Sequence, residues 1–156
     1  MPLLKAYIVP HPPLAVEEVG GKDTEVIRKT IASYHKVARE IAALKPETII
    51  VSSPHSIMYA DYIHVSPGEK ASGDFRNFGH GEVGMEKTYD TLLVDEIVKE
   101  AQNARLRAGT LGEKDKSLDH GTMVPLYFVD KEYHDYKLVR LSISGLPLSD
   151  HYEFGK

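Results

Sequence analysis

The sequence contains no cysteine. This absence excludes disulfide bonds, thiolate metal ligands and a cysteine nucleophile, and it leaves His, Asp and Glu as the strong metal ligands. The sequence also lacks an apolar run of about 18 residues that could cross a bilayer, and a charged and apolar leader before a cleavage site. We therefore expect a soluble, cytoplasmic protein with no membrane partner, in which any metal ion has nitrogen and oxygen ligands.

Basic and acidic residues are scattered along the chain. There are 19 Lys and Arg against 23 Asp and Glu, which gives a net charge of -4. Proteins that bind nucleic acid present a clustered basic surface, so we expect no nucleic-acid partner and favour a small-molecule partner. Of the 156 residues, 42% are hydrophobic, which is enough to bury the core of one domain.

The apolar pattern predicts alternating strands and helices. Apolar residues at spacings of three and four indicate helices, and short β-branched runs between turn residues indicate strands. We expect strands at Leu3–Val9, Thr48–Ser52, Tyr62–Val65, Leu106–Leu111 and Tyr136–Ile143, helices from Asp23 or Thr24 to about Leu44, at Asp90–Ala104 and at Asp119–Val129, and a glycine-rich loop at Gly68–Gly84. This order predicts an α/β fold, a three-layer αβα sandwich around a mostly parallel central sheet.

The last residues, Ser149–Lys156, have the pattern of the first turn of a helix, with Ser149 or Asp150 as its cap. The sequence stops before such a helix could bury an apolar face. We therefore expect residues 1–156 to be the N-terminal part of a single domain that is truncated at its C-terminus.

Two histidines, His11 and His55, directly follow predicted strands. Ligands of open α/β sheets bind beyond the carboxyl ends of the strands, so both imidazoles could reach one crevice. Their neighbours, in Pro10-His11-Pro12-Pro13 and Ser53-Pro54-His55, include prolines that restrict the backbone and present each ring from a stiff turn. Spacing alone leaves two interpretations open: a metal site, or two His-Pro turns that are packed or exposed.

Asp119, His120 and Gly121 lie at the start of a predicted helix. An aspartate beside a histidine could orient the ring or raise its proton affinity, which would make His120 a proton donor or shuttle. Gly121 would let a substrate or the backbone approach closely. The alternative is that Asp119 caps the helix and His120 is incidental. His80, in the glycine-rich loop, is a weaker candidate for substrate contact, because histidines in surface loops are common.

With these motifs, the chain closely resembles the class III extradiol ring-cleavage dioxygenases, which have the LigB-like fold of the catalytic subunit of protocatechuate 4,5-dioxygenase. Within that family it is most similar to the subgroup found fused to, or encoded beside, an AMMECR1 domain and a radical-SAM protein. The resemblance covers nearly all 156 residues. It is carried, in chain order, by Pro10–Pro13, Glu18–Gly21, Ser53–His55, Asp74–Phe75 with Phe78–Gly79, and Leu118–Thr122 with Val124–Leu126.

The resemblance implies a non-haem Fe(II) enzyme that cleaves an aromatic diol of the catechol type with O₂. It implies that His11 and His55 are iron ligands, and that His120, helped by Asp119, transfers protons near the substrate. Zn²⁺ or another divalent ion could replace iron in the purified protein. The family's third ligand, a glutamate, and its second active-site histidine are expected beyond Lys156. Residues 1–156 are therefore expected to hold only part of the family's site.

The resemblance leaves three functions to be distinguished. The first is the extradiol dioxygenase. The second is a Memo-like binding or regulatory protein without enzymatic activity, and the third is a metalloenzyme that acts on a substrate other than a catechol in an AMMECR1 and radical-SAM pathway. The resemblance also implies an AMMECR1-domain partner or fusion, and we expect a homo-oligomer.

Overall fold

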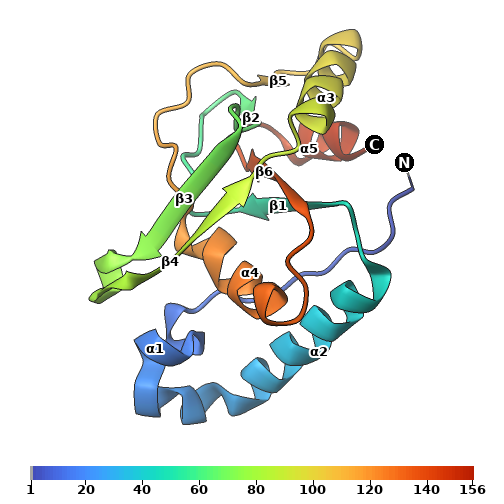
Figure 1. Ribbon diagram of the computed structural model, residues 1–156. Coiled ribbons are helices and arrows are strands. Elements are labelled where there is room, and N and C mark those ends of the chain that lie inside the picture. The colour runs from blue at the N-terminus through green and yellow to red at the C-terminus, as the bar shows by residue number, and fades with distance from the viewer. Residues whose placement is uncertain (1) are drawn as a thin grey trace. The chain divides into compact units, whose positions relative to one another are not determined.

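The computed structural model describes residues 2–156, and the chain divides into two compact units. Unit 1 consists of Met1–Glu47, Gly73–Met85 and His120–Tyr136. Unit 2 consists of Thr48–Ser72, Glu86–Asp119 and Lys137–Lys156. The predicted α/β class is confirmed, because helices are interspersed with strands that pair in parallel (Figure 1). Each unit is assembled from segments that are far apart in the sequence.

Unit 1 is mainly helical. Its long helix α2 (Arg28–Leu44) packs against α4 (His120–Glu132), as Figure 1 shows. Tyr34 of α2 stacks on Phe128 of α4 with 4.4 Å between the ring centroids, and both residues are buried. Burial of the Tyr34 side chain raises the pKa of its hydroxyl. The other helical segments of unit 1 are α1 (Glu17–Gly20) and 3₁₀ segments at Pro13–Ala15, Gly21–Ile27 and Arg76–Phe78.

The first long helix was predicted correctly at its end but not at its start. α2 ends at Leu44, where Lys45 takes the left-handed backbone conformation (φ 48°) ahead of a proline. The predicted cap at Asp23 or Thr24 is wrong, because both residues lie in the 3₁₀ segment that precedes the helix. The Thr24 hydroxyl donates to the carbonyl oxygen of Gly21 at 2.7 Å, so it closes a turn of that segment.

The predicted strand at Leu3–Val9 is wrong. The segment has no regular secondary structure, and within residues 2–156 no strand pairs with it. An apolar run becomes a strand only when a neighbour satisfies its backbone groups. The segment instead contacts α2 through polar side chains, since Lys5 and Tyr7 donate to the Glu40 carboxylate at 2.5 and 3.0 Å. Its exposed apolar side chains are Leu3, Leu4 and Ile8.

Unit 2 contains both parallel strand pairs. β1 (Thr48–Ser53) pairs with β6 (Lys137–Ser142), and β2 (Ile63–His64) pairs with β5 (Ala108–Gly109). The four strands predicted in unit 2 are therefore confirmed, although β2 and β5 are only two residues long. Val65, Val94 of α3 and Val139 of β6 form a buried cluster. The helices are α3 (Thr91–Asn103) and α5 (Leu148–Gly155). The helix predicted at Ser149–Lys156 is confirmed, but the predicted cap at Ser149 or Asp150 is wrong, because both residues lie inside α5.

The predicted loop at Gly68–Gly84 is wrong, because it contains a β-hairpin. β3 (Lys70–Phe75) and β4 (His80–Thr88) are paired neighbours that run in opposite directions in Figure 1. The glycines that suggested a loop permit close strand pairing. A Cβ at Gly84 would lie 2.6 Å from the carbonyl oxygen of Gly73, so a larger residue would push the strands apart. Gly79 has a φ of 85° and turns the chain between them.

Replacing Asp90 with alanine is expected to lower the free energy of unfolding by about 1–2 kcal/mol at pH 7. The Asp90 carboxylate caps α3 by accepting from the backbone N–H of Leu93 at 3.1 Å and from the Thr48 hydroxyl at 2.5 Å. The hydrogen bond from Thr48 is the main cause that lowers the Asp90 pKa, and the Leu93 N–H adds to it.

A lowered carboxyl pKa stabilises the fold at pH values above the unfolded pKa of about 3.9, and this contribution is lost as pH falls through the folded pKa. Urea unfolding of the wild type and of Asp90→Ala should therefore show a stability difference that narrows in acid. A difference that stays constant from pH 7 to pH 3 would contradict the assigned role of the charge.

Candidate functional site

His11 and His120 lie close together in unit 1. His11 stands between Pro10 and Pro12, just before the 3₁₀ segment Pro13–Ala15. The first backbone hydrogen bond of that segment runs from the N–H of Ala15 to the carbonyl oxygen of Pro12 at 2.9 Å. His120 is the first residue of α4. Their ring centroids are 5.9 Å apart, with the ring planes tilted by 53°. The expectation that His11 follows a strand is wrong, yet the proline-flanked turn places its ring beside the predicted proton carrier.

An aromatic side chain from the hairpin packs on the His120 ring. Phe78 approaches it edge to face, with ring centroids 5.2 Å apart and planes at 74°. Phe78 ends the 3₁₀ segment between β3 and β4, where Gly79 provides the left-handed turn. An edge-to-face contact at this distance is attractive and limits the ring orientations that His120 can adopt. The Phe78-Gly79 motif therefore has a local role: it orients His120.

The weaker predicted site residues, His80 and Gly121, also belong to unit 1. His80 begins β4, and its Nδ1 lies 2.9 Å from the Glu82 carboxylate in an exposed pair. Gly121 is buried in the first turn of α4, directly after His120. Contact of either residue with a substrate stays a prediction.

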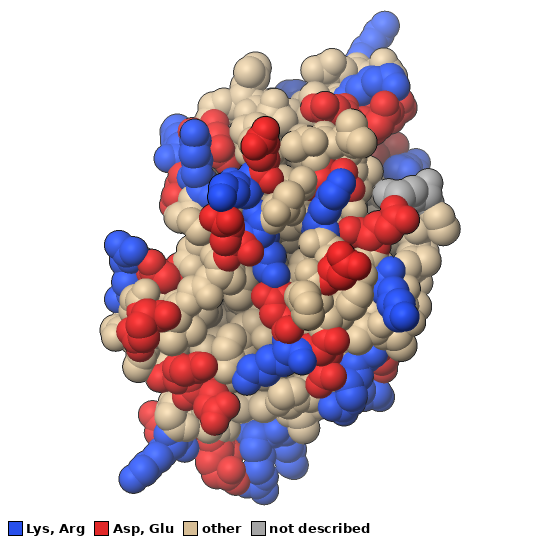
Figure 2. Space-filling model, in the orientation of Figure 1, with Lys and Arg blue, Asp and Glu red and all other residues tan. Residues whose placement is uncertain are grey.

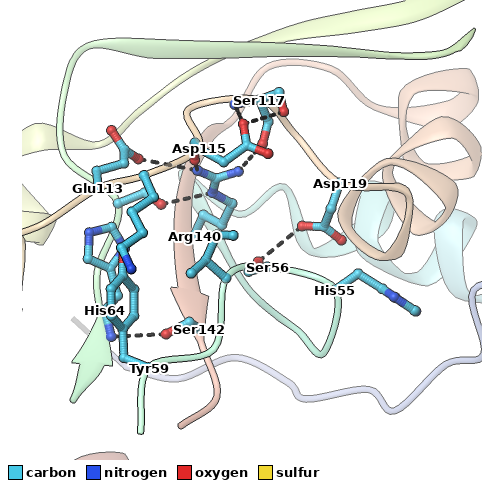
Figure 3. A pocket seen from close by; sticks show the side chains of 13 residues that line it. His55, Ser56, Tyr59, His64, Glu113, Asp115, Ser117, Asp119, Arg140 and Ser142 are labelled. Atoms are coloured by element: carbon cyan, nitrogen blue, oxygen red, sulfur yellow. Dashed lines mark hydrogen bonds and ion pairs between the residues drawn. The ribbon is translucent and has the colours of Figure 1, made fainter. Parts of the chain in front are cut away.

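His55 lies in unit 2, in a turn that directly follows β1. Residues 53–56 are called the His55 turn below. The Ser53 hydroxyl accepts the backbone N–H of His55 at 3.1 Å and donates to the Asp119 carboxylate at 2.5 Å. The Ser56 hydroxyl donates to the second oxygen of the same carboxylate at 3.0 Å (Figure 3). One carboxylate therefore holds both ends of the His55 turn.

These hydrogen bonds give Asp119 a role that was not predicted. The sequence suggested that Asp119 orients His120 or caps the helix, and its role toward His120 stays a prediction. Its two oxygens accept from Ser53 and Ser56, which precede it by 66 and 63 residues. Hydrogen bonds to a carboxylate are among the stronger ones in proteins, so the two hydrogen bonds to Asp119 restrain the backbone that presents the His55 ring.

A small polar cavity adjoins the His55 turn in unit 2 (Figure 3). His64 and Arg140 line it, and they are only 6% and 4% exposed. Burial is the main cause that lowers the His64 pKa, since it disfavours the charged ring. Arg140 is held by several acceptors from the loop before α4. Neither Arg140 nor the two serines were predicted as site residues.

The sequence did contain a signal for Arg140. It interrupts an apolar run, Leu138-Val139-Arg140-Leu141, within a strand predicted to be buried. A buried guanidinium must be paired and hydrogen-bonded, so an arginine in such a run indicates acceptors nearby. The identity of those acceptors depends on the fold and could not be predicted.

On the face that Figure 2 shows, basic and acidic side chains are interspersed. The absence of a nucleic-acid partner stays a prediction. Within residues 2–156, no helix combines the length and the apolar character needed to cross a membrane.

The family model for the catalytic LigB subunit of aromatic ring-opening dioxygenase matches residues 5–156. The chain is also similar to Protein CA_C1420 of Clostridium acetobutylicum, with 36% identity over 156 residues that cover 96% of this chain. The chain spans 33% of the length of that relative. The His11 turn, the His55 turn and the start of α4 all lie inside the matched region.

Proposed function

We propose that the chain, which belongs to the family of catalytic LigB subunits of aromatic ring-opening dioxygenases, carries the histidines of a metal-dependent extradiol enzyme. The substrate would be a catechol-type aromatic diol, opened by O₂ next to its hydroxyl-bearing carbons. The observation that carries the proposal is the closeness of His11 and His120, with 5.9 Å between ring centroids, at the motifs expected to supply a ligand and a proton carrier.

The donor set fits a non-haem Fe(II) ion. His11, His55 and His120 offer imidazole nitrogens, and a chain without cysteine provides no competing thiolate. We assign His11 and His55 as the ligands and propose that a glutamate outside these 156 residues completes the set. When bound, iron in a site with two histidines and one carboxylate supplies open positions for a catecholate and O₂.

His120 then serves as the proton carrier. Imidazole exchanges a proton near neutral pH, and its efficiency in catalysis depends on a fixed position relative to the substrate. The Phe78 edge on the His120 ring provides such a restraint. In this proposal an imidazole nitrogen of His120 gives a proton to the leaving oxygen as the ring opens. An AMMECR1-domain partner and a homo-oligomer stay predictions from the resemblance.

The full-length protein, which includes the segment expected to supply the glutamate, is expected after anaerobic loading with Fe(II) to consume O₂ when a catechol is added and to form a yellow ring-opened product. An oxygen electrode and visible absorption would follow the reaction across a panel of catechols. Background uptake across the panel, with iron shown to be bound, would instead favour the Memo-like binding role or a substrate that is not a catechol.

A further inference from the structure

We propose that Arg140 and Glu113 are positioning residues for His55. They fix the loop between β5 and α4, and this loop ends in Asp119, whose carboxylate holds the His55 turn. The inference rests on the proposed function, in which His55 is a metal ligand. The whole network lies within unit 2. Figure 3 labels its members Arg140, Glu113, Asp115, Ser117, Asp119, Ser56 and His55.

Arg140 donates to four acceptors. Its Nε donates to the Ser66 hydroxyl at 2.8 Å. Its terminal nitrogens donate to the Glu113 carboxylate at 3.2 Å, to the carbonyl oxygen of Asp115 at 3.1 Å and to the carbonyl oxygen of Ser117. Three of the four acceptors therefore belong to the loop before α4. This set of contacts is called the Arg140 clamp.

The clamp is buried, although the loop that it holds is exposed. The Arg140 and Glu113 side chains are only 4% and 9% exposed, whereas Lys114, Asp115 and Lys116 are all exposed. An exposed segment without regular structure buries little apolar surface to fix its own position. The loop is anchored at its start by Tyr59 and Tyr62 and near its end by Leu118, and the Arg140 clamp holds the residues between.

The stability of the fold gives only a weak reason to bury an ion pair such as Arg140 and Glu113. Removing two charges from water costs several kcal/mol per ion, and a well-packed apolar pair of similar volume is often at least as stable. The planar guanidinium instead fixes positions, because its N–H groups hold several acceptors in one defined arrangement. The Arg140 clamp therefore sets the position of the loop more than it adds to the stability of unit 2.

Asp119 connects the loop to the turn that carries His55. Ser117, which the clamp holds, precedes Asp119 by two residues. Asp119 accepts from both serines of the His55 turn, and the Ser53 hydroxyl accepts the N–H of His55 itself. A shift of the loop would weaken these hydrogen bonds and release the backbone that presents the His55 ring.

The test is Arg140→Lys, which keeps the positive charge and removes the planar guanidinium group. The first measurement is hydrogen exchange of the His55 amide in the metal-free protein, and the second is Co²⁺ affinity, followed by its visible absorption. We expect His55 amide exchange to rise about tenfold and Co²⁺ affinity to fall about tenfold, since removing groups that orient a metal ligand costs 10–100-fold.

Two control variants separate positioning from general damage. Val139→Ala removes buried apolar atoms from the neighbouring residue of β6, so it lowers stability without touching the clamp. Arg107→Lys changes an exposed arginine that pairs with Asp150 at 3.2 Å in the same unit. Both controls should keep Co²⁺ affinity within about twofold of the wild type and leave the His55 amide protected, since neither removes a hydrogen bond of the Arg140 side chain.

If Arg140→Lys does not fold, the second variant is Glu113→Gln, which keeps the size of the side chain and removes its charge. It should raise His55 amide exchange and lower Co²⁺ affinity by a smaller factor. Unchanged exchange and affinity in a folded clamp variant would overturn the inference, as would equal changes in Val139→Ala. If the wild type binds no Co²⁺ or Fe²⁺ while the His55 amide still responds, the metal assignment fails and the positioning role stands.

Discussion

Replacing His11 with alanine is expected to reduce Fe(II) affinity by at least about a hundredfold and to abolish catechol-dependent O₂ uptake. Loss of a group that merely orients a ligand already costs 10–100-fold in affinity, and loss of a ligand removes a bond to the metal itself. His11 is held by flanking prolines in a turn before a 3₁₀ segment, so truncating its side chain should leave the backbone unchanged. Iron content after anaerobic loading and dialysis measures the effect.

The matched control is His134→Ala. His134 is an exposed histidine of the same unit, just after α4, and its loss should leave both iron content and O₂ uptake unchanged. Full iron occupancy in His11→Ala would remove His11 from the ligand set and with it the basis of the proposed function.

Replacing His120 with alanine is expected to lower the rate of O₂ uptake by about 10²–10⁴-fold while iron content stays unchanged. This range is the usual contribution of a positioned general acid or base. His120→Gln is the matched variant, because an amide keeps hydrogen-bonding capacity and comparable size but does not titrate near neutral pH. Both variants should lose turnover equally if proton transfer is the role of the imidazole.

Two outcomes would contradict this role. Loss of iron from both variants would make His120 a metal ligand. Recovery of turnover in His120→Gln would mean that the ring acts through packing, for which its edge-to-face contact with Phe78 provides the route.

Features that depend on local sequence could be predicted from it. The end of α2 and the turns at His11 and His55 are marked by prolines, which fix φ whatever the rest of the chain does. The parallel strands β1 and β6 are rich in β-branched and apolar residues, and they were also found where predicted. The histidine motifs carry the same kind of local information, so candidate site residues could be named from the sequence, and their roles stay predictions.

Features that depend on distant partners could not be predicted. The segment Leu3–Val9 has the composition of a strand, but a strand also needs a paired neighbour. The role of Asp119 depends on hydroxyl groups more than 60 residues earlier in the chain. The glycines of β3 and β4 suggested a loop because the sequence does not show which backbone each of them faces.

The parallel pairing of β1 with β6 also determines when the His55 turn can form during synthesis. Thr48 pairs with Lys137, and about 85 residues separate His55 from Arg140. At translation rates of about 5–20 residues per second, that interval lasts about 4–17 s. Contacts between such distant residues also close slowly, because the chain entropy of the intervening loop must be overcome first. His55 therefore emerges from the ribosome well before the strand and the arginine that fix its turn, and a nascent chain carries this imidazole in an unrestrained state.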